Sequence, residues 1–283
     1  MMRTIFVPLG QGLSSQPALD AALSLSKCLN SHIWAVFVRP DPSVALSSVP
    51  GVIATTEMHQ AIQREISNAA ETQRVEFETW RSRHGIPTMP VEHRLDTCFA
   101  SWLKKSGEIE PVVTRLGRVS DLIVLSRFAA DNFQAQRCFD AALFGTGRPT
   151  LLAPEKPAGN LIDHVLIAWN GSREASHAVF GVLPLLHAAG RVSIFSVPEP
   201  ENDGATGDEL AEVLSWQGIR ANEAIRPSAP SSIGAALLDT ATKSEATLIV
   251  MGAYTHSRLR QRFLGGVTTH VLSEAMVSVV MSH

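Results

Sequence analysis

Short apolar runs alternate with longer amphipathic segments along the first half of the chain. Residues 4–7 (TIFV), 33–38 (IWAVFV) and 121–125 (DLIVL) are apolar at almost every position, which is typical of strands buried on both faces of a parallel sheet. Between these runs, apolar side chains recur at steps of three and four residues, and this period predicts helices at 15–29 and 57–84. The alternation predicts an α/β fold with a mostly parallel sheet.

The remaining elements of the first half have weaker patterns. We expect a strand at 91–95, a helical region at 99–116 that Pro111 interrupts, a short helix at 139–144 and a strand at 150–153. Ser14 or Ser15 is available as the N-cap of the first helix.

After residues 154–160 (PEKPAGN) the same plan begins again. Two prolines, a glycine and charged side chains indicate a linker with few packing contacts. Beyond it, the pattern predicts a further series of strands and helices, with Ser172 as an N-cap. These elements are strand 165–169, helix 173–188, strand 192–197, helix 208–216, edge strand 219–225, helix 232–243, strand 247–251, a helix from His270 and a strand at 277–281.

Four short motifs recur in the same order in both halves. PLGQG recurs as AWNGS, VFVRPDP as IFSVPEP, DLIVLS as TLIVMG, and PTLLAP as SVVMSH. The repeat predicts two domains, at residues 1–153 and 163–283, joined by a linker at 154–162. Each domain is expected to have a five-stranded, mostly parallel sheet with helices on both faces.

The charge balance and the cysteines restrict the class of protein. Lys and Arg total 24 against 27 Asp and Glu, so the basic surplus that a nucleic-acid partner requires is missing. No apolar run reaches the roughly 18 residues of a membrane span, and the amino terminus lacks the pattern of a signal peptide. The three cysteines are far apart and form no CxxC pair, which predicts reduced thiols, no metal site and a cytoplasmic location.

The segment 252–269 (GAYTHSRLRQRFLGGVTT) has the strongest candidate chemistry. It follows a predicted strand, leads into a predicted helix, has glycines near both ends and has three arginines between them. Glycines allow backbone N–H groups to approach a phosphate, and the first turn of a helix has free donors. The pattern therefore predicts an anion site, although the Walker motif is absent. The alternative is a tight crossover with a solvated basic face.

The segments VLIAWNGSREA and VMGAYTHSRLRQRFLGGVTTHVLSEA, together with the two alternating halves, resemble a tandem universal stress protein. The resemblance implies two flavodoxin-like (adenine nucleotide α-hydrolase-like) domains. It also implies a role in the stress response and an adenine nucleotide such as ATP, accompanied by Mg²⁺, in the C-terminal domain. The last strands, 150–153 and 279–281, are then expected to pair across a pseudo-twofold axis, and further homo-oligomers such as dimers are expected.

Nucleotide-binding members of that family have the motif G-x2-G-x9-G-[S/T] after the fourth strand. Here Gly252 and Gly265 match, whereas Thr255 replaces the second glycine and Gly266 replaces the Ser or Thr. Asn170 stands where the family has an acidic residue after the first strand. By this resemblance, adenine would lie near Asn170 and the phosphates near the glycines. The full candidate set is Ala168, Trp169, Asn170, Val197, Met251, Gly252, Thr255, His256, Arg258, Gly265, Gly266, Val267 and Thr268.

Several alternatives remain open from the sequence. The first half has Gly10 at the acidic position, Ser126 at the first glycine and no paired glycines, so it is expected to have lost any nucleotide site. Trp169 fits packing as well as base stacking, and His256 fits a solvated loop as well as a phosphate contact. No Ser-His-Asp, Cys-His or HExxH arrangement occurs, so we expect at most a slow ATPase. A nucleotide-free scaffold protein of the stress response is the alternative function.

Overall fold

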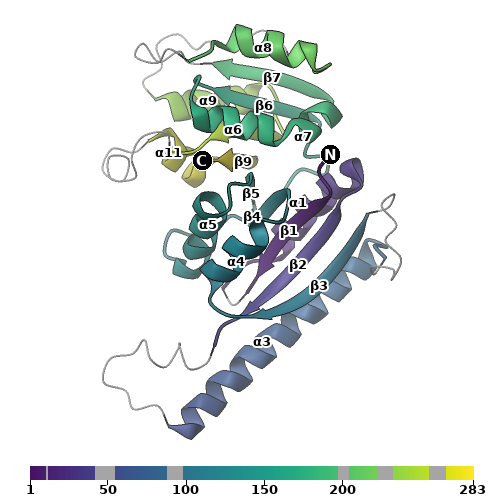
Figure 1. Cartoon of the computed structure of the whole chain (residues 1–283), viewed down its shortest axis with the longest axis vertical. Helices are drawn as coiled ribbons and strands as arrows, with labels where there is room; N and C mark the ends of the chain where they lie inside the picture. Colours follow the sequence, from purple (N-terminus) through teal and green to yellow (C-terminus); the bar gives the residue numbers. More distant parts are fainter. Residues whose placement is uncertain (11, 42–54, 88–97, 197–203, 222–231, 255–265) are drawn as a thin grey trace.

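The computed structural model describes residues 1–10, 12–41, 55–87, 98–196, 204–221, 232–254 and 266–283. Figure 1 shows strands and helices alternating through both halves of the chain. The elements of the first half are β1 (Thr4–Leu9), α1 (Gln16–Leu29), β2 (His32–Arg39), α3 (Thr56–Arg83), β3 (Phe99–Ser106), α4 (Ile109–Gly117), β4 (Leu122–Ser126), α5 (Phe133–Gly145) and β5 (Thr150–Ala153).

The second half repeats this alternation. Its elements are β6 (His164–Trp169), α6 (Arg173–Gly181), α7 (Leu183–Ala188), β7 (Arg191–Ser196), α8 (Gly207–Trp216), α9 (Ile233–Lys243), β8 (Leu248–Gly252), α11 (Val267–Glu274) and β9 (Ser278–Ser282). No helix among the described residues has the length and apolar character needed to cross a membrane.

The nine strands of the described residues join into one sheet with the order β3-β2-β1-β4-β5-β9-β8-β6-β7. Neighbouring strands are parallel within each half, and only the central pair of β5 and β9 is antiparallel. In that pair Leu151 lies opposite Val280 and Thr150 opposite Met281. The predicted pairing of the two final strands is therefore confirmed.

Two hydrophobic clusters cover the two faces of the sheet. One includes buried side chains of α1, α3, α6, α7 and α8, and the other those of α4, α5, α9 and α11. Successive strand residues alternate between them, since Ile5 and Val7 belong to the first cluster and Phe6 to the second. Helices on both faces explain why the strands are nearly continuous apolar runs.

The prediction of a helix from residue 99 is wrong. Residues 99–106 form β3, which pairs with β2 along its whole length, and the helix expected over 99–116 begins only at Ile109. An edge strand has one free side, so its exposed Lys104 and Lys105 interrupt the apolar pattern while protecting the edge. Pro111 lies in the first turn of α4, where the missing N–H costs nothing. The strand expected at 91–95 lies outside the described residues.

Three further boundaries differ from the prediction. The helix expected at 173–188 breaks at Val182 because Pro184 cannot continue the backbone ladder, and it forms α6 and α7. The helix expected at 139–144 is longer, beginning at Phe133 behind the N-cap Asn132. The edge strand expected at 219–225 is present as a single bridge between Val192 and Ala221, and residues 222–231 lie outside the described part.

The end of the predicted linker packs into the core. Leu161 and Ile162 are at most 3% exposed, and the Leu161 N–H donates to Ser24 Oγ of α1 at 3.0 Å. Thr247 Oγ1 donates to the Leu161 carbonyl at 2.9 Å. Leu161, directly after the PEKPAGN segment, is therefore attached to both halves. The domain boundaries themselves stay a prediction.

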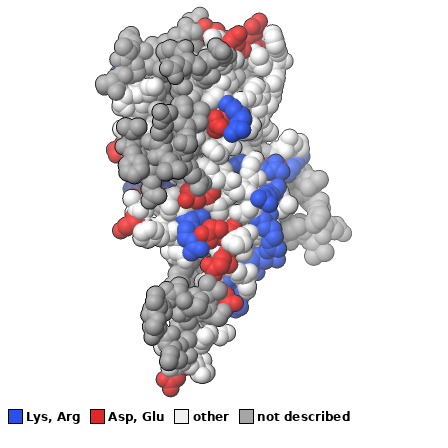
Figure 2. Space-filling model, turned by 60° about the vertical axis from the view of Figure 1, so that its left-hand side comes forward, with Lys and Arg blue, Asp and Glu red and all other residues white. Residues whose placement is uncertain are grey.

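Charges of both signs lie beside one another on the face shown in Figure 2. Arg137 of α5 forms ion pairs with Glu110 and Glu108 at the start of α4, and the hydrogen bond to Glu110 raises the pKa of the Arg137 guanidinium. Such exposed pairs connect neighbouring helices at modest energetic value.

Candidate functional site

The candidate site of the second half lies where β6 and β8 end. These strands are parallel neighbours with Ala168 opposite Met251, so Asn170 and Gly252 follow at the same edge of the sheet. Ligands of open α/β sheets bind beyond the carboxyl ends of such strands. The structure therefore places Asn170 and Gly252, which are far apart in the sequence, at one edge of the sheet.

Gly252 is required by packing. A Cβ at this position would lie 2.5 Å from the Ala175 backbone nitrogen and 2.7 Å from the Glu174 carbonyl carbon. Real Cβ atoms do not approach backbone atoms that closely, so α6 can rest on the end of β8 only because residue 252 has no side chain. The first glycine of the motif thus has a structural role whether or not a ligand is present.

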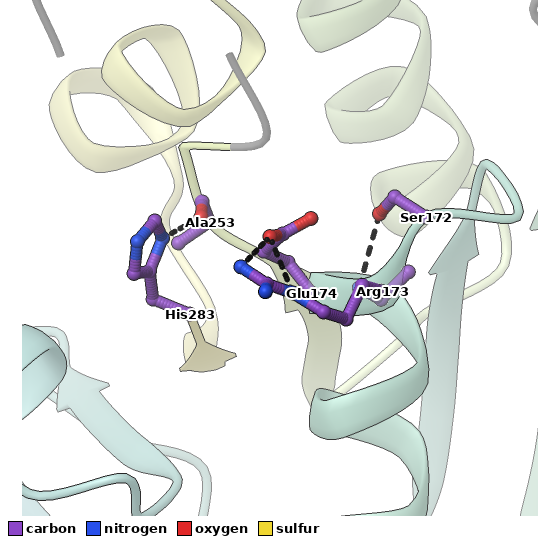
Figure 3. Close-up of polar contacts among 6 residues, drawn as sticks. Ser172, Arg173, Glu174, Ala253 and His283 are labelled. Carbon is purple, nitrogen blue, oxygen red and sulfur yellow. Dashed lines mark hydrogen bonds and ion pairs between the residues drawn. The ribbon is translucent and has the colours of Figure 1, made fainter. Parts of the chain in front are cut away.

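The amino terminus of α6 is satisfied by its own side chains, as Figure 3 shows. Ser172 Oγ accepts the Ala175 N–H at 3.1 Å, which confirms Ser172 as the N-cap. Glu174 is 6% exposed and pairs with the Arg173 guanidinium at 3.0 Å. A carboxylate in the first turn favours the helix dipole. The Ala175 N–H is therefore satisfied by the chain itself.

Trp169 and Met251 belong to the core. Trp169 is 6% exposed, and its indole N–H donates to the Ala205 carbonyl at 2.7 Å. Met251 is 4% exposed. Burial leaves the Trp169 ring little surface on which a base could stack, which favours the packing interpretation of this residue. Ala168 is half-buried in β6.

Asn170 shapes the turn between β6 and α6. Its Oδ1 accepts the Ser172 N–H at 3.2 Å, and Gly171 between them has a φ of 76°. A Cβ on Gly171 would lie 3.0 Å from backbone atoms of Gly204 and Ala205. The amide oxygen of Asn170 is thus already used by the backbone, as is common for Asn in turns.

The amino terminus of α11 differs from that of α6. Its N-cap is Gly266, which makes no side-chain cap hydrogen bond. The first N–H groups of the helix therefore have no side-chain acceptor at the N-cap position. Thr268 is 5% exposed, and its Oγ1 accepts the Tyr254 N–H at 3.3 Å. This bond holds the start of α11 against the segment leaving β8. Val267 is half-buried.

Five of the predicted site residues cannot be placed. Val197, Thr255, His256, Arg258 and Gly265 lie outside the described residues.

Sequence patterns could hardly indicate the residues that other elements bring to this edge of the sheet. His283 Nδ1 lies 3.0 Å from the Ala253 carbonyl oxygen. Phe144 of α5, in the first half, contacts both Tyr254 and His283 through its ring. The pairing of β5 with β9 brings these residues together, and only the position of His283 directly after the last strand could have indicated its place.

A basic side chain also crosses between the halves. Arg127 follows β4, and its Nη1 donates to the carbonyl of Ala275, the C-cap of α11. Burial lowers the pKa of the Arg127 guanidinium. Its Nε and Nη2 are buried without a partner among the described residues. The C-terminal end of α11 is thereby fixed to the first half of the chain.

The corresponding edge of the first half encloses a small cavity of about 230 Å³ between β1, β4 and α5. Ser126 Oγ accepts the Ala18 N–H at 3.0 Å and donates to the Ser14 carbonyl at 2.7 Å. Asn132 caps α5, and its side-chain amide donates to the Gly12 carbonyl at 2.8 Å. Both helix termini at this edge are therefore capped from within the chain.

Comparisons with known proteins agree with this architecture. A model of the Universal stress protein family matches residues 229–283, which confirms the predicted resemblance over α9, β8, α11 and β9. No curated protein matches the chain.

Two solved structures have a similar fold over nearly the whole chain. A universal stress protein from Archaeoglobus fulgidus is 18% identical with a TM-score of 0.67, and the match covers 97% of each chain. A functionally unknown protein from Pseudomonas aeruginosa is 13% identical with a TM-score of 0.52, covering 99% of this chain and 92% of the other. At such identities the likeness shows the fold, and it confirms the predicted fold class.

Proposed function

We propose that this chain is a tandem universal stress protein that binds ATP, or a related adenine nucleotide with its Mg²⁺, in the C-terminal half only. The observation that supports the proposal most is the N-terminus of α11. It starts at Gly266 without a side-chain cap, beside the end of β8. It also lies in the segment that matches the family.

The contrast between helix termini supports a phosphate at α11. Ser172, Thr206 and Ser232 cap α6, α8 and α9 with their side chains, whereas Val182 at α7 and Gly266 at α11 make no side-chain cap bond. A terminus with free N–H groups and a positive dipole end favours an anion. Gly266 lacks the hydroxyl of the family motif, but it leaves the backbone open to close approach.

The base would lie toward Asn170, on the neighbouring strand end. Asn170 has an amide that can both donate and accept hydrogen bonds, although its Oδ1 already accepts the Ser172 N–H. Trp169 is packed inside, so the proposal assigns it no stacking role.

Calorimetric titration with Mg·ATP tests the proposal, with Gly266→Asp as the main variant. Asp is a good N-cap at the backbone conformation of Gly266, with φ −63° and ψ 162°. It should therefore keep or raise stability while its carboxylate repels phosphate, weakening binding by about tenfold or more. Ser232→Asp, at the N-cap of α9, is the matched control and should leave binding unchanged.

Absence of heat with wild-type protein at about 1 mM Mg·ATP, where even a weak site is half filled, would contradict the proposal. Equal affinity of the wild type and Gly266→Asp would contradict the assignment to α11.

A nucleotide-free scaffold protein is the second candidate function. It is favoured by the roles already found for the site residues, since packing requires Gly252 and Tyr254 engages the Thr268 hydroxyl. A partner pull-down that is unchanged by Mg·ATP, together with a silent titration, would favour it. Phosphate release lost in Gly266→Asp would instead indicate a slow ATPase. Homo-oligomers and a cytoplasmic location stay predictions.

A further inference from the structure

The segment that leaves β8 rests on the first half of the chain. Tyr254 lies two residues after β8, and its ring packs against that of Phe144 in α5, with the centroids 5.4 Å apart and the planes at 47°. Phe144 also meets the His283 ring edge-on, with the centroids 4.9 Å apart. Figure 1 shows α5 beside β9 and α11. Aromatic rings favour tilted and edge-on contacts of this kind, so α5 provides the surface on which Tyr254 lies.

The backbone of Tyr254 has a conformation that its side chain disfavours. Its φ is 57°, in the left-handed region where the Cβ of a residue other than glycine is crowded. Asn30 and Glu245 are the other non-glycine residues of the described chain with a positive φ, and each lies at the C-terminal end of a helix, where this conformation is common. Tyr254 follows a strand instead. A strained residue keeps its conformation only where its surroundings hold it.

The contacts of Tyr254 lead directly to the start of α11. Its N–H donates to Thr268 Oγ1 at 3.3 Å, and Thr268 is the second residue of α11 and is 5% exposed. The preceding residue, Ala253, is fixed on both sides, because its N–H donates to the Ser282 carbonyl at 2.9 Å and its carbonyl accepts from His283 Nδ1 at 3.0 Å. The first half therefore holds the ring of Tyr254, while the Tyr254 N–H holds the first turn of α11.

The opposite end of α11 is also attached to the first half. Arg127, directly after β4, donates through Nη1 to the carbonyl of Ala275, the C-cap of α11. Its Nε and Nη2 are buried without a partner in the described part of the chain, and a cation at the C-terminal end of a helix is favourable. Because α11 has only 8 residues, Val267–Glu274, contacts at its two ends determine where its N-terminus lies.

We propose that the first half positions the phosphate-binding terminus of α11, with Phe144 and Arg127 as positioning residues. They act through Tyr254 and Ala275 rather than by touching the nucleotide. The half that lacks the paired glycines thus has a part in the nucleotide site of the other half. The identity of the ligand rests on the proposed function, whereas the positioning of α11 needs no ligand. Because coupling between sites is reciprocal, Mg·ATP should in turn stabilise the contact between the halves.

A single-site spectroscopic probe tests the contact between the halves. Tyr254 is the only tyrosine of the chain, so the whole chain labelled with 3-fluorotyrosine has one ¹⁹F NMR resonance. This resonance should shift in Phe144→Leu, which keeps an apolar side chain but loses the ring. Phe133→Leu is the matched control and should leave the resonance unchanged, since Phe133 lies on the same helix and is 79% exposed. The same resonance in the wild type and in Phe144→Leu would overturn the proposal.

Hydrogen exchange followed by NMR tests whether the effect reaches α11. The reporters are the amides of Tyr254 and His270, which are hydrogen-bonded at the start of α11. Both should exchange about tenfold faster in Phe144→Leu and in Arg127→Met, because the helix start opens more often. Arg127→Lys should restore most of the protection, since lysine also donates to a carbonyl. Circular dichroism checks that each variant is folded. Wild-type exchange rates in both variants would overturn the proposal.

Calorimetric titration with Mg·ATP tests the link to the ligand. The affinity should fall about fivefold in Phe144→Leu, because a favourable aromatic contact is lost, and should be unchanged in Phe133→Leu. Phe144→Tyr keeps the ring and should bind as the wild type does. Equal affinity of the wild type and Phe144→Leu would overturn the proposal. A silent titration with the wild type would contradict the proposed function instead, and the ¹⁹F and exchange measurements would still decide whether the first half positions α11.

Discussion

The two halves of the chain end their central strands in the same way but differ at one residue. Ser126 ends β4 opposite Ala153, and Gly252 ends β8 opposite Ser282. In both halves the next backbone N–H donates to that opposite carbonyl, at 2.7 and 2.9 Å. The positions are therefore equivalent in the repeat. Position 126 has a hydroxyl that binds the Ala18 N–H and the Ser14 carbonyl. Position 252 has no space for a side chain.

The difference shows two ways of completing a helix terminus. In the second half, Ser172 caps α6 with its own side chain, and Gly252 allows the helix to touch the strand end. In the first half, the N-cap Ser15 makes no cap bond, and Ser126 reaches across from β4 to bind the Ala18 N–H. A glycine in a repeat is thus not sufficient evidence for a phosphate site, because helix packing can require it.

Gly252→Ser should lower the free energy of unfolding most. It introduces the residue found at the equivalent position 126, but the structure has no space for a side chain at position 252. The new Cβ would meet backbone atoms at 2.5 and 2.7 Å, and overpacking of this kind costs about 3 kcal/mol. Urea denaturation measures the change. Gly159→Ser is the control, since a Cβ there meets nothing within 4 Å. A stable Gly252→Ser protein would show that α6 can move away from β8.

The next largest effect should be a dependence of the free energy of unfolding on pH, which originates at His32 at the start of β2 in the first half. Burial lowers the pKa of His32 from 6.5 to about 4. The unfolded chain therefore binds the proton first as pH falls, and stability decreases between about pH 6.5 and 4. Discounted for partial exposure, the loss is about 2 kcal/mol.

His32→Gln should flatten the dependence of the free energy of unfolding on pH over that range. His177→Gln, whose side chain is exposed, should not. A slope unchanged by His32→Gln would show that His164, whose pKa is also lowered chiefly by burial, determines the dependence.

Ser126→Ala and Ser172→Ala should each cost about 1 kcal/mol, because each removes the acceptor of a first-turn N–H. Thermal unfolding of the two variants compares the two ways of capping a helix directly. Ser126→Ala should be slightly the worse, since it also loses the bond to Ser14. A much smaller effect in the first half would mean that water replaces Ser126 easily.

Ser15→Ala should have the smallest effect, within about 0.5 kcal/mol, although Ser15 is the residue at the N-cap position. The same melting measurement tests this. A cost as large as that of Ser172→Ala would show that Ser15 caps α1 in solution.

For much of the candidate site, the sequence predicted where a residue lies relative to the strands and helices but not which residues it contacts. The sequence located Gly252 and Asn170 at strand ends, and it identified Ser172 as an N-cap that the structure confirms. It could not show that Gly252 touches Ala175, that Trp169 is buried, or that Tyr254 occupies the Thr268 hydroxyl. Each of these depends on a contact between residues that are distant in sequence.

The strong local patterns determined most of the fold by themselves. Continuous apolar runs gave the buried strands, the repeated motifs gave two copies of one plan, and these followed from periodicity and burial. The same patterns did not predict β3, because its exposed lysines interrupt the apolar run. They also did not predict where α4 begins, because Pro111 lies in its first turn. A strand with one free side need not be apolar throughout.

Sequence alone therefore determined the alternation, the repeat and the family resemblance, because local periodicity and motif residues encode them. Tertiary structure decided how the halves join and which polar groups stay unpaired. The antiparallel pairing of β5 with β9 makes one sheet and brings Phe144 against Tyr254 and His283. Whether a terminus such as that of Ser15 or Gly266 is capped depends on side chains arriving from elsewhere, and only the folded chain supplies them.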